Sequence, residues 1–188
     1  MKRDAALRLL AKSVRTDDIV VAVYQTLFDW LEICPRDLNY VATGAMGQGS
    51  SHGLGLALAN PERRVLVFDG DGSLLMNLGS LATVAGAAPC NLFHFVFANG
   101  TYEVNGSHPI PAADRIDFAA MALAAGYSTA EKWDSIDALN SGVQSFLGNP
   151  GPAFAELTVE PGRPYRRDYS YIHSYKARDA FRRALNAS

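Results

Sequence analysis

Two stretches of the chain are almost continuously apolar: VLVF at residues 65–68 and NLFHFVFA at residues 91–98. This pattern is typical of parallel strands that are covered on both faces. Three further strands are predicted at residues 18–23, 38–43 and 152–159. The apolar positions between the strands recur at helical spacing, so each strand is followed by a predicted helix.

The predicted helices cover residues 3–14, 26–34, 54–59, 73–89, 116–127, 135–148 and 174–186, where 73–89 is one helix or two short ones. Strands and helices alternate along the whole chain. The sequence therefore predicts an α/β fold, with one parallel sheet and helices on both of its faces. No repeat, linker or composition boundary interrupts this alternation, so we expect a single domain over residues 1–188.

Composition narrows the class of protein. The chain is 48% apolar and 19% charged, which is enough apolar surface for a substantial core and excludes a disordered protein. Its formal net charge of -2 and the absence of a reading motif argue against nucleic-acid binding. No run approaches the ~20 apolar residues of a membrane helix. Cys34 and Cys90 lie far apart, as expected for reduced thiols, so we expect a cytoplasmic protein with no membrane contact.

Glycine and polar residues gather where the predicted strands end, and ligands of parallel sheets bind there. Asp71 lies between Gly70 and Gly72, and Ser73 then begins a helix. A helix N-terminus attracts anions, so a carboxylate beside it needs a bridging cation, and Mg²⁺ accepts such oxygen ligands. Asn99, at the end of the next predicted strand, supplies a second oxygen. The alternative is a tight turn in which Asp71 only caps the helix.

This motif has two ends, a GDG and, 26 residues later, Asn99-Gly100. It resembles the diphosphate- and Mg²⁺-binding motif of thiamine diphosphate (ThDP) enzymes. Residues 43–84 are similar to the corresponding stretch of phosphonopyruvate and sulfopyruvate decarboxylases. The resemblance covers roughly residues 5–160 and implies a ThDP-binding fold. It also implies that Asp71, Asn99 and the carbonyl of Thr101 bind Mg²⁺.

The resemblance implies further contacts to ThDP. Ser73 and Tyr102 would contact the diphosphate, and Gly70 and Gly72 would let the backbone approach the ligand closely. Met46 would wedge beneath the cofactor and force its bent shape. The remaining expected cofactor contacts are the Gly44 carbonyl to the aminopyrimidine, and Gln25 and Thr26 to the diphosphate.

Two departures from the family pattern bear on these assignments. The segment that contains Gln25 and Thr26 lacks the usual Gly- and Ser-containing form. Ala98 stands where the family often has a first of two adjacent asparagines. Because the second asparagine is the expected ligand, we expect metal binding to survive.

His108 is the candidate catalytic residue. It lies in a long predicted loop, residues 99–115, just past the expected metal ligands. A histidine there could donate a proton or hold an anion near the reacting carbon. The decarboxylases that the chain resembles have a glutamine-containing stretch at this place, which leaves the substrate open. We expect the other histidines, His52, His94 and His173, to be structural.

ThDP enzymes also need a glutamate that activates the cofactor from a separate pyrimidine-binding domain. None of the six glutamates of this chain matches the pattern of that domain. The resemblance therefore implies the β subunit of a non-oxidative 2-oxo acid decarboxylase, a carboxy-lyase that is inactive without a pyrimidine-binding α subunit. Its exposed cofactor face would favour self-association. The alternatives are part of an acetolactate synthase-like carboligase and a non-catalytic cofactor-binding protein.

Overall fold

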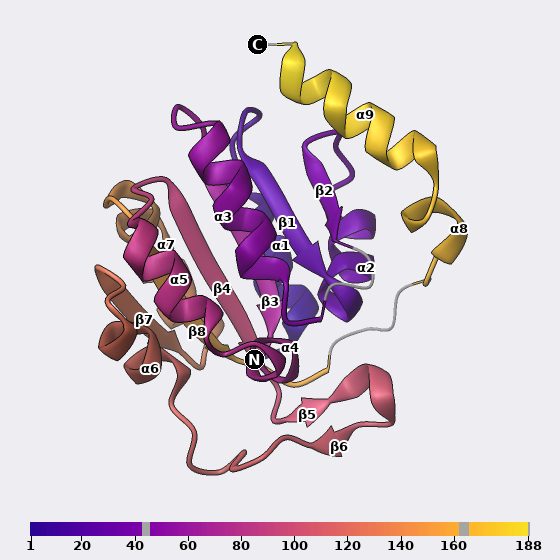
Figure 1. The fold of residues 1–188 in the computed structure, drawn as a ribbon. Coiled ribbons are helices and arrows are strands. Elements are labelled where there is room, and N and C mark those ends of the chain that lie inside the picture. Colours follow the sequence, from indigo (N-terminus) through magenta and orange to yellow (C-terminus); the bar gives the residue numbers. More distant parts are fainter. Residues whose placement is uncertain (43–45, 162–165, 188) are drawn as a thin grey trace.

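The computed structural model describes residues 1–42, 46–161 and 166–187 (Figure 1). Within them, six parallel strands form the main sheet: β1 (Ile19–Val23), β2 (Asn39–Ala42), β3 (Val65–Gly70), β4 (Leu92–Ala98), β7 (Thr129–Trp133) and β8 (Ala153–Thr158). Their order in the sheet is β2-β1-β3-β4-β8-β7. The chain therefore builds outward from β1 to β2 and then returns to the other side of β1 with β3. This makes the β1/β3 boundary the switch point, where α/β sheets bind ligands.

Helices cover both faces of this sheet, as the alternating sequence predicts (Figure 1). One face packs against α1 (Arg3–Ala11), α2 (Tyr24–Ile33), α7 (Ile136–Gly148) and the short α8 (Tyr169–Ile172). The other face packs against α3 (Gly49–Ala59), α4 (Asp71–Met76), α5 (Ser80–Ala87), α6 (Phe118–Ala125) and α9 (Tyr175–Asn186). The predicted segment 73–89 thus forms two short helices.

The two faces of the sheet have separate apolar cores. Successive residues of β4 point to opposite sides: Phe93, Phe95 and Phe97 enter one core, while Leu92 and Val96 enter the other. All five are at most 2% exposed. This confirms the prediction that the continuously apolar stretches are strands covered on both faces.

Small residues bring α3 close to the sheet. A Cβ at Gly49 would lie 2.6 Å from Cγ2 of Val23, and one at Gly53 would overlap Cγ2 of Val67. The helix begins at Gly49 rather than at the predicted residue 54. The Gly/Ser-rich stretch before residue 54 is helical because its small side chains fit this narrow gap.

The structure adds elements that the sequence patterns did not predict. β7 is an edge strand whose Glu131 and Lys132 are exposed and whose Trp133 is buried, so it lacks the apolar run of a central strand. The predicted loop at 99–115 contains an antiparallel hairpin. Its parts are β5 (Thr101–Tyr102), the 3₁₀ turn η1 (Glu103–Asn105) and β6 (His108–Pro109). Figure 1 shows this hairpin beyond the carboxyl ends of the main strands.

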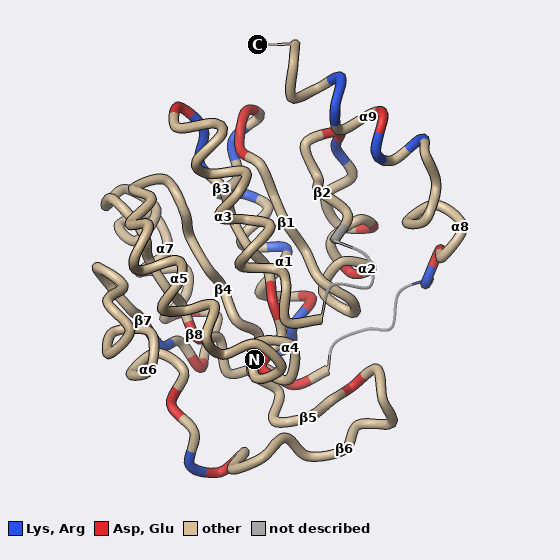
Figure 2. The backbone as a smooth tube through the Cα atoms, in the orientation of Figure 1, with Lys and Arg blue, Asp and Glu red and all other residues tan. Residues whose placement is uncertain are grey.

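The C-terminal helix α9 is amphipathic. Ala177 and Phe181 are buried, and the ring of Phe181 lies 5.3 Å from that of Tyr40 on β2. Figure 2 shows basic positions recurring along this helix, and its basic residues are exposed. Of the helices in the described part of the chain, none is both long and apolar enough to cross a bilayer.

Candidate functional site

A cavity opens at the carboxyl ends of β1, β3 and β4, beside the switch point of the sheet. It brings together most of the residues that the sequence singled out. The expected site residues that line it are Gln25, Thr26, Met46, Gly70, Asp71, Gly72, Ser73, Asn99, Thr101 and Tyr102. Gly44, the remaining expected cofactor contact, lies outside the described residues.

Asp71 is the buried anion of this cavity. It follows β3 directly and is 2% exposed. Its Oδ1 accepts a hydrogen bond from Gly72 N at 2.8 Å, and its Oδ2 accepts one from Gly100 N at 2.6 Å. Burial raises the pKa of its carboxyl, although these backbone N–H groups oppose the shift. The ion pairs that the described residues form do not include Asp71. A bound cation would supply the missing countercharge.

Asn99 and Thr101 lie beside this carboxylate because β3 and β4 are neighbours. The hydrogen bond from Gly100 to Asp71 joins the two strand ends. Asn99 Oδ1 accepts hydrogen bonds from Thr101 N at 2.8 Å and from Thr101 Oγ1 at 3.0 Å. Thr101 pairs with Pro109, which has no N–H to donate, so this pairing does not use the Thr101 carbonyl.

These three residues fit a magnesium site by their chemistry: a carboxylate, an amide oxygen and a backbone carbonyl are all ligands that Mg²⁺ accepts. Across residues 1–42, 46–161 and 166–187, no three His, Cys, Asp or Glu side chains form a metal-binding group. The expected ligand set differs from such a group because it contains only one carboxylate.

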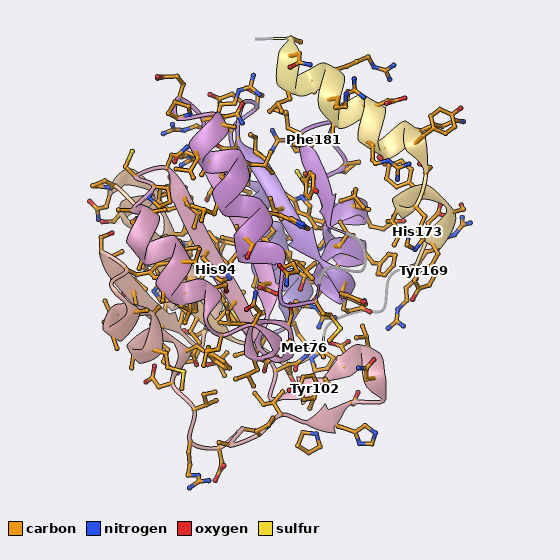
Figure 3. The ribbon with its side chains drawn as sticks, viewed as in Figure 1. Met76, His94, Tyr102, Tyr169, His173 and Phe181 are labelled. Carbon is orange, nitrogen blue, oxygen red and sulfur yellow. The ribbon has the colours of Figure 1, made fainter. Side chains whose placement is uncertain are left out.

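The two glycines of the GDG have different surroundings. No described atom lies within 4 Å of a Cβ placed on Gly70. A Cβ on Gly72 would lie 2.5 Å from Cδ1 of Tyr102, whose ring covers this glycine. Figure 3 shows Tyr102 at this end of the sheet. Gly70 therefore leaves space that a ligand can fill, whereas the space at Gly72 is taken by an aromatic ring.

Ser73 and Met46 lie on two neighbouring segments of the wall. Ser73 is 8% exposed, and its Oγ accepts a hydrogen bond from Gly47 N at 3.0 Å. This bond ties the first turn of α4 to the segment that carries Met46. Met46 is half-buried and faces the cavity.

The turn from β1 into α2 forms the third side of the cavity. Tyr24 takes the left-handed conformation, with φ 48°, which is rare for a residue with a large side chain. Gln25 and Thr26 are 8% and 4% exposed. Gln25 Nε2 donates to Asp29 Oδ1 at 2.9 Å, and Gln25 Oε1 is buried without a hydrogen-bond partner among the described residues.

Three charged residues at this cavity escaped the sequence analysis. Arg3 on α1 donates to Asp29 Oδ2 at 2.7 Å, and its Nη1 and Nη2 donate to the carboxylate of Glu103. Burial lowers the pKa of Arg3, but the bonds and charges of Glu103 and Asp29 outweigh that effect and raise it overall. No local pattern marks these residues, because they are far apart in the sequence and each resembles an ordinary surface charge.

His108 is not brought to the cavity. It is exposed on β6, and it is not among the lining residues. A role in catalysis stays a prediction, and it would require another chain or a substrate to meet the hairpin. His94 is fully buried (Figure 3). Its Nε2 lies 3.6 Å from Asp69 Oδ2, and its Nδ1 lies 3.3 Å from the hydroxyl oxygen of Tyr127.

The glutamates of the chain are engaged elsewhere or lie outside this cavity. Glu103 lines it, but its carboxylate binds Arg3 and accepts from Asn99 Nδ2 at 3.0 Å. Glu156 is buried, caps α6 through the N–H groups of Phe118 and Ala119, and pairs with Lys132. Among the described residues, the cavity therefore offers no uncommitted glutamate.

The parallel sheet and the polar cavity at its switch point define an α/β cofactor-binding domain. Residues 23–157 match the family model of the "Thiamine pyrophosphate enzyme, C-terminal TPP binding domain". The chain belongs to this family. The predicted α/β fold and the resemblance to ThDP enzymes are thereby confirmed.

Similar proteins include decarboxylases. The chain is 39% identical over 161 residues to a phosphonopyruvate decarboxylase of Streptomyces viridochromogenes, covering 85% of this chain and 40% of that protein. It is 42% identical over 124 residues to the sulfopyruvate decarboxylase subunit beta of Methanothermobacter thermautotrophicus, covering 66% and 63%. It thus spans less than two thirds of either relative. The fold is shared by a solved structure from Mycobacterium smegmatis, named a "putative thiamin diphosphate-dependent enzyme", with a TM-score of 0.71. The two chains are 24% identical, and the match covers 86% of this chain and 32% of that one.

Proposed function

We propose that this chain is the ThDP- and Mg²⁺-binding β subunit of a non-oxidative 2-oxo acid decarboxylase. The observation that carries the proposal is the buried Asp71 carboxylate, which lies beside Asn99 and Thr101 and has no ion-pair partner among the described residues, in a chain of the TPP-binding family. The relatives named for phosphonopyruvate and sulfopyruvate favour a substrate with an anionic group on its third carbon.

Each wall of the cavity has a part in this function. Asp71, Asn99 and the Thr101 carbonyl would hold Mg²⁺, which in turn would hold the diphosphate. Ser73 and Tyr102 would fix the diphosphate, and Met46 would set the shape of the cofactor. When bound, ThDP supplies the nucleophilic carbon and takes up the electrons that CO₂ leaves behind. The residues of this chain bind and orient the cofactor, and they exclude water from one side of it.

The proposal includes a partner that carries the activating glutamate. In the described residues Glu103 is already bound to Arg3 and Asn99, which supports a glutamate from another chain. The name "subunit beta" of one relative also supports a two-chain enzyme. Co-expression with a pyrimidine-binding subunit should give decarboxylation of 3-phosphonopyruvate or 3-sulfopyruvate, while this chain alone, which we expect to self-associate, should be inactive.

Calorimetric titration with ThDP in the presence of Mg²⁺ tests the binding part of the proposal. The parent chain should bind, and Asp71→Ala should lose binding while circular dichroism shows it folded. Equal affinity in both would contradict the metal assignment. Turnover by the purified chain alone, lost on mutation of one of its own glutamates, would contradict the two-chain assignment.

A further inference from the structure

A continuous row of hydrogen bonds connects four residues that line the cavity through a fifth, Asp29, that does not. It passes from Gln25 through Asp29, Arg3 and Glu103 to Asn99. We call these five residues the buried polar chain. They come from α1, α2, η1 and the end of β4, so the row joins segments up to 100 positions apart in the sequence.

Both ends of the buried polar chain are amides, and each amide is held by its NH₂ group. Gln25 Nε2 donates to Asp29 at 2.9 Å, and Asn99 Nδ2 donates to Glu103 at 3.0 Å. A carboxylate accepts hydrogen bonds but cannot donate them, so it selects the NH₂ end of an amide. The carbonyl oxygens must therefore point away from the carboxylates. That of Asn99 lies on the side of Thr101, and that of Gln25 is buried without a partner among the described residues.

Arg3 holds the middle of the buried polar chain. It is 3% exposed and Asp29 is 0% exposed. Its Nε donates to Asp29 and its two Nη groups donate to Glu103. A planar guanidinium can reach two carboxylates in this way, whereas the compact ammonium of lysine cannot keep the same fork of bonds. Arg3 thus fixes both carboxylates, which in turn hold the NH₂ groups of both amides, while Thr101 also holds the Asn99 oxygen.

We propose that Arg3, Asp29 and Glu103 are positioning residues that keep the amide oxygens of Gln25 and Asn99 turned toward the cation side of the cavity. This rests on the proposed function and deepens it, because it assigns an orienting role to residues outside the proposed set of metal and cofactor contacts. Outer hydrogen-bond partners of metal ligands commonly control metal affinity in this manner.

The orientation also determines what Gln25 can bind. One N–H of its NH₂ group donates to Asp29, and its carbonyl oxygen is the atom left without a partner among the described residues. An oxygen acceptor repels the oxygens of a diphosphate but attracts a cation or the protons of a water on that cation. The unpartnered oxygen of Gln25 would therefore suit a cation, or a water bound to it, better than the diphosphate itself.

Two substitutions of Glu103 separate orientation from charge. Glu103→Gln and Glu103→Met have side chains of similar length, and both remove the charge opposite Arg3. Only the glutamine keeps an oxygen that Asn99 Nδ2 can donate to. The matched control is Glu160→Met, because Glu160 forms an exposed ion pair with Lys2, at 3.1 Å, outside the buried polar chain.

The probe is Mn²⁺, whose binding is measured by loss of the free-ion paramagnetic resonance signal, with and without ThDP. Glu103→Met should lower Mn²⁺ affinity by about tenfold or more. Glu103→Gln should stay within about threefold of the parent, and the control should match the parent. Thermal melts and circular dichroism establish that each variant is folded.

The possible outcomes separate this inference from the proposed function. Equal weakening by Gln and Met, or no weakening by Met, would overturn the positioning role while leaving the metal site in place. A folded parent chain that binds no Mn²⁺, with or without ThDP, would overturn the proposed metal site and the positioning role with it.

Discussion

Gly72→Ala tests why the GDG turn needs its second glycine. The new Cβ would lie 2.5 Å from Cδ1 and 2.8 Å from Cε1 of Tyr102. Carbon atoms in ordinary contact are about 3.5–4.0 Å apart, so the ring would have to move by about 1 Å. Overpacking of this kind costs about 1–3 kcal/mol, and the better helix propensity of alanine offsets up to about 1 kcal/mol. We expect the free energy of unfolding to fall by about 1–2 kcal/mol.

The same substitution should have the opposite effect on the free energy of unfolding when the Tyr102 ring is absent. In a Tyr102→Ala background nothing opposes the new Cβ, so Gly72→Ala should stabilise the chain by up to about 1 kcal/mol. In a chain of this length each kcal/mol shifts Tm by about 2–4 °C, which thermal melts of the four proteins resolve. The two changes should therefore show a coupling energy of about 2 kcal/mol.

A loss of stability from Gly72→Ala that is equal in both backgrounds would refute this reasoning. ThDP affinity measured on the same four proteins distinguishes the other explanation, close approach of the cofactor to the backbone. If the Gly72→Ala change lowers ThDP affinity by the same factor with and without the ring, the glycine is needed by the cofactor as well.

Gly53→Ala should destabilise the chain because its Cβ overlaps Val67. Gly55→Ala on the same helix meets no described atom within 4 Å, so it should stabilise the chain by about 0.5–1 kcal/mol. Denaturant melts compare the two variants, and equal effects on stability would contradict the packing of α3. Burial raises the pKa of Asp71, so the metal-free parent binds more protons when folded and loses stability as pH rises above about 4. The difference in Tm between Asp71→Asn and the parent should therefore increase in favour of the variant between pH 4 and 7. A difference that stays constant would contradict the raised pKa of Asp71. Met46→Ala should lower turnover of the co-expressed enzyme more than it lowers ThDP affinity; a fall in turnover of less than about twofold, or ~0.4 kcal/mol, would make Met46 an ordinary packing residue.

The parts of the fold that could be predicted are those with local causes. β3 and β4 are buried on both faces, so their composition alone marks them, and their order along the chain places Asp71 near Asn99. β7 could not be recognised in this way, because an edge strand keeps polar residues on its open side. The start of α3 was missed because its Gly/Ser run reads as a loop until the sheet beneath it is known.

The site shows the same division between local and long-range causes. Its metal-side residues follow strand ends and have spacing that a family motif records. Arg3, Asp29 and Glu103 have no such spacing, since their contacts join α1, α2 and η1 through the folded chain. A charged residue on a predicted helix is normally assigned to the surface, and only the three-dimensional arrangement shows Arg3 and Asp29 buried together.

Three features that are unfavourable in the free chain lie at the cavity end of the sheet. Tyr24 has a positive φ, Asp71 is a buried anion without an ion pair in the described residues, and Gln25 has a buried oxygen without a partner there. Strain and unsatisfied polar groups of this kind persist where a ligand compensates for them. A cation beside Asp71 would relieve the buried charge and could also satisfy the oxygen of Gln25. One bound cation would therefore compensate for both features, whereas a helix cap at Asp71 leaves the buried oxygen of Gln25 unexplained.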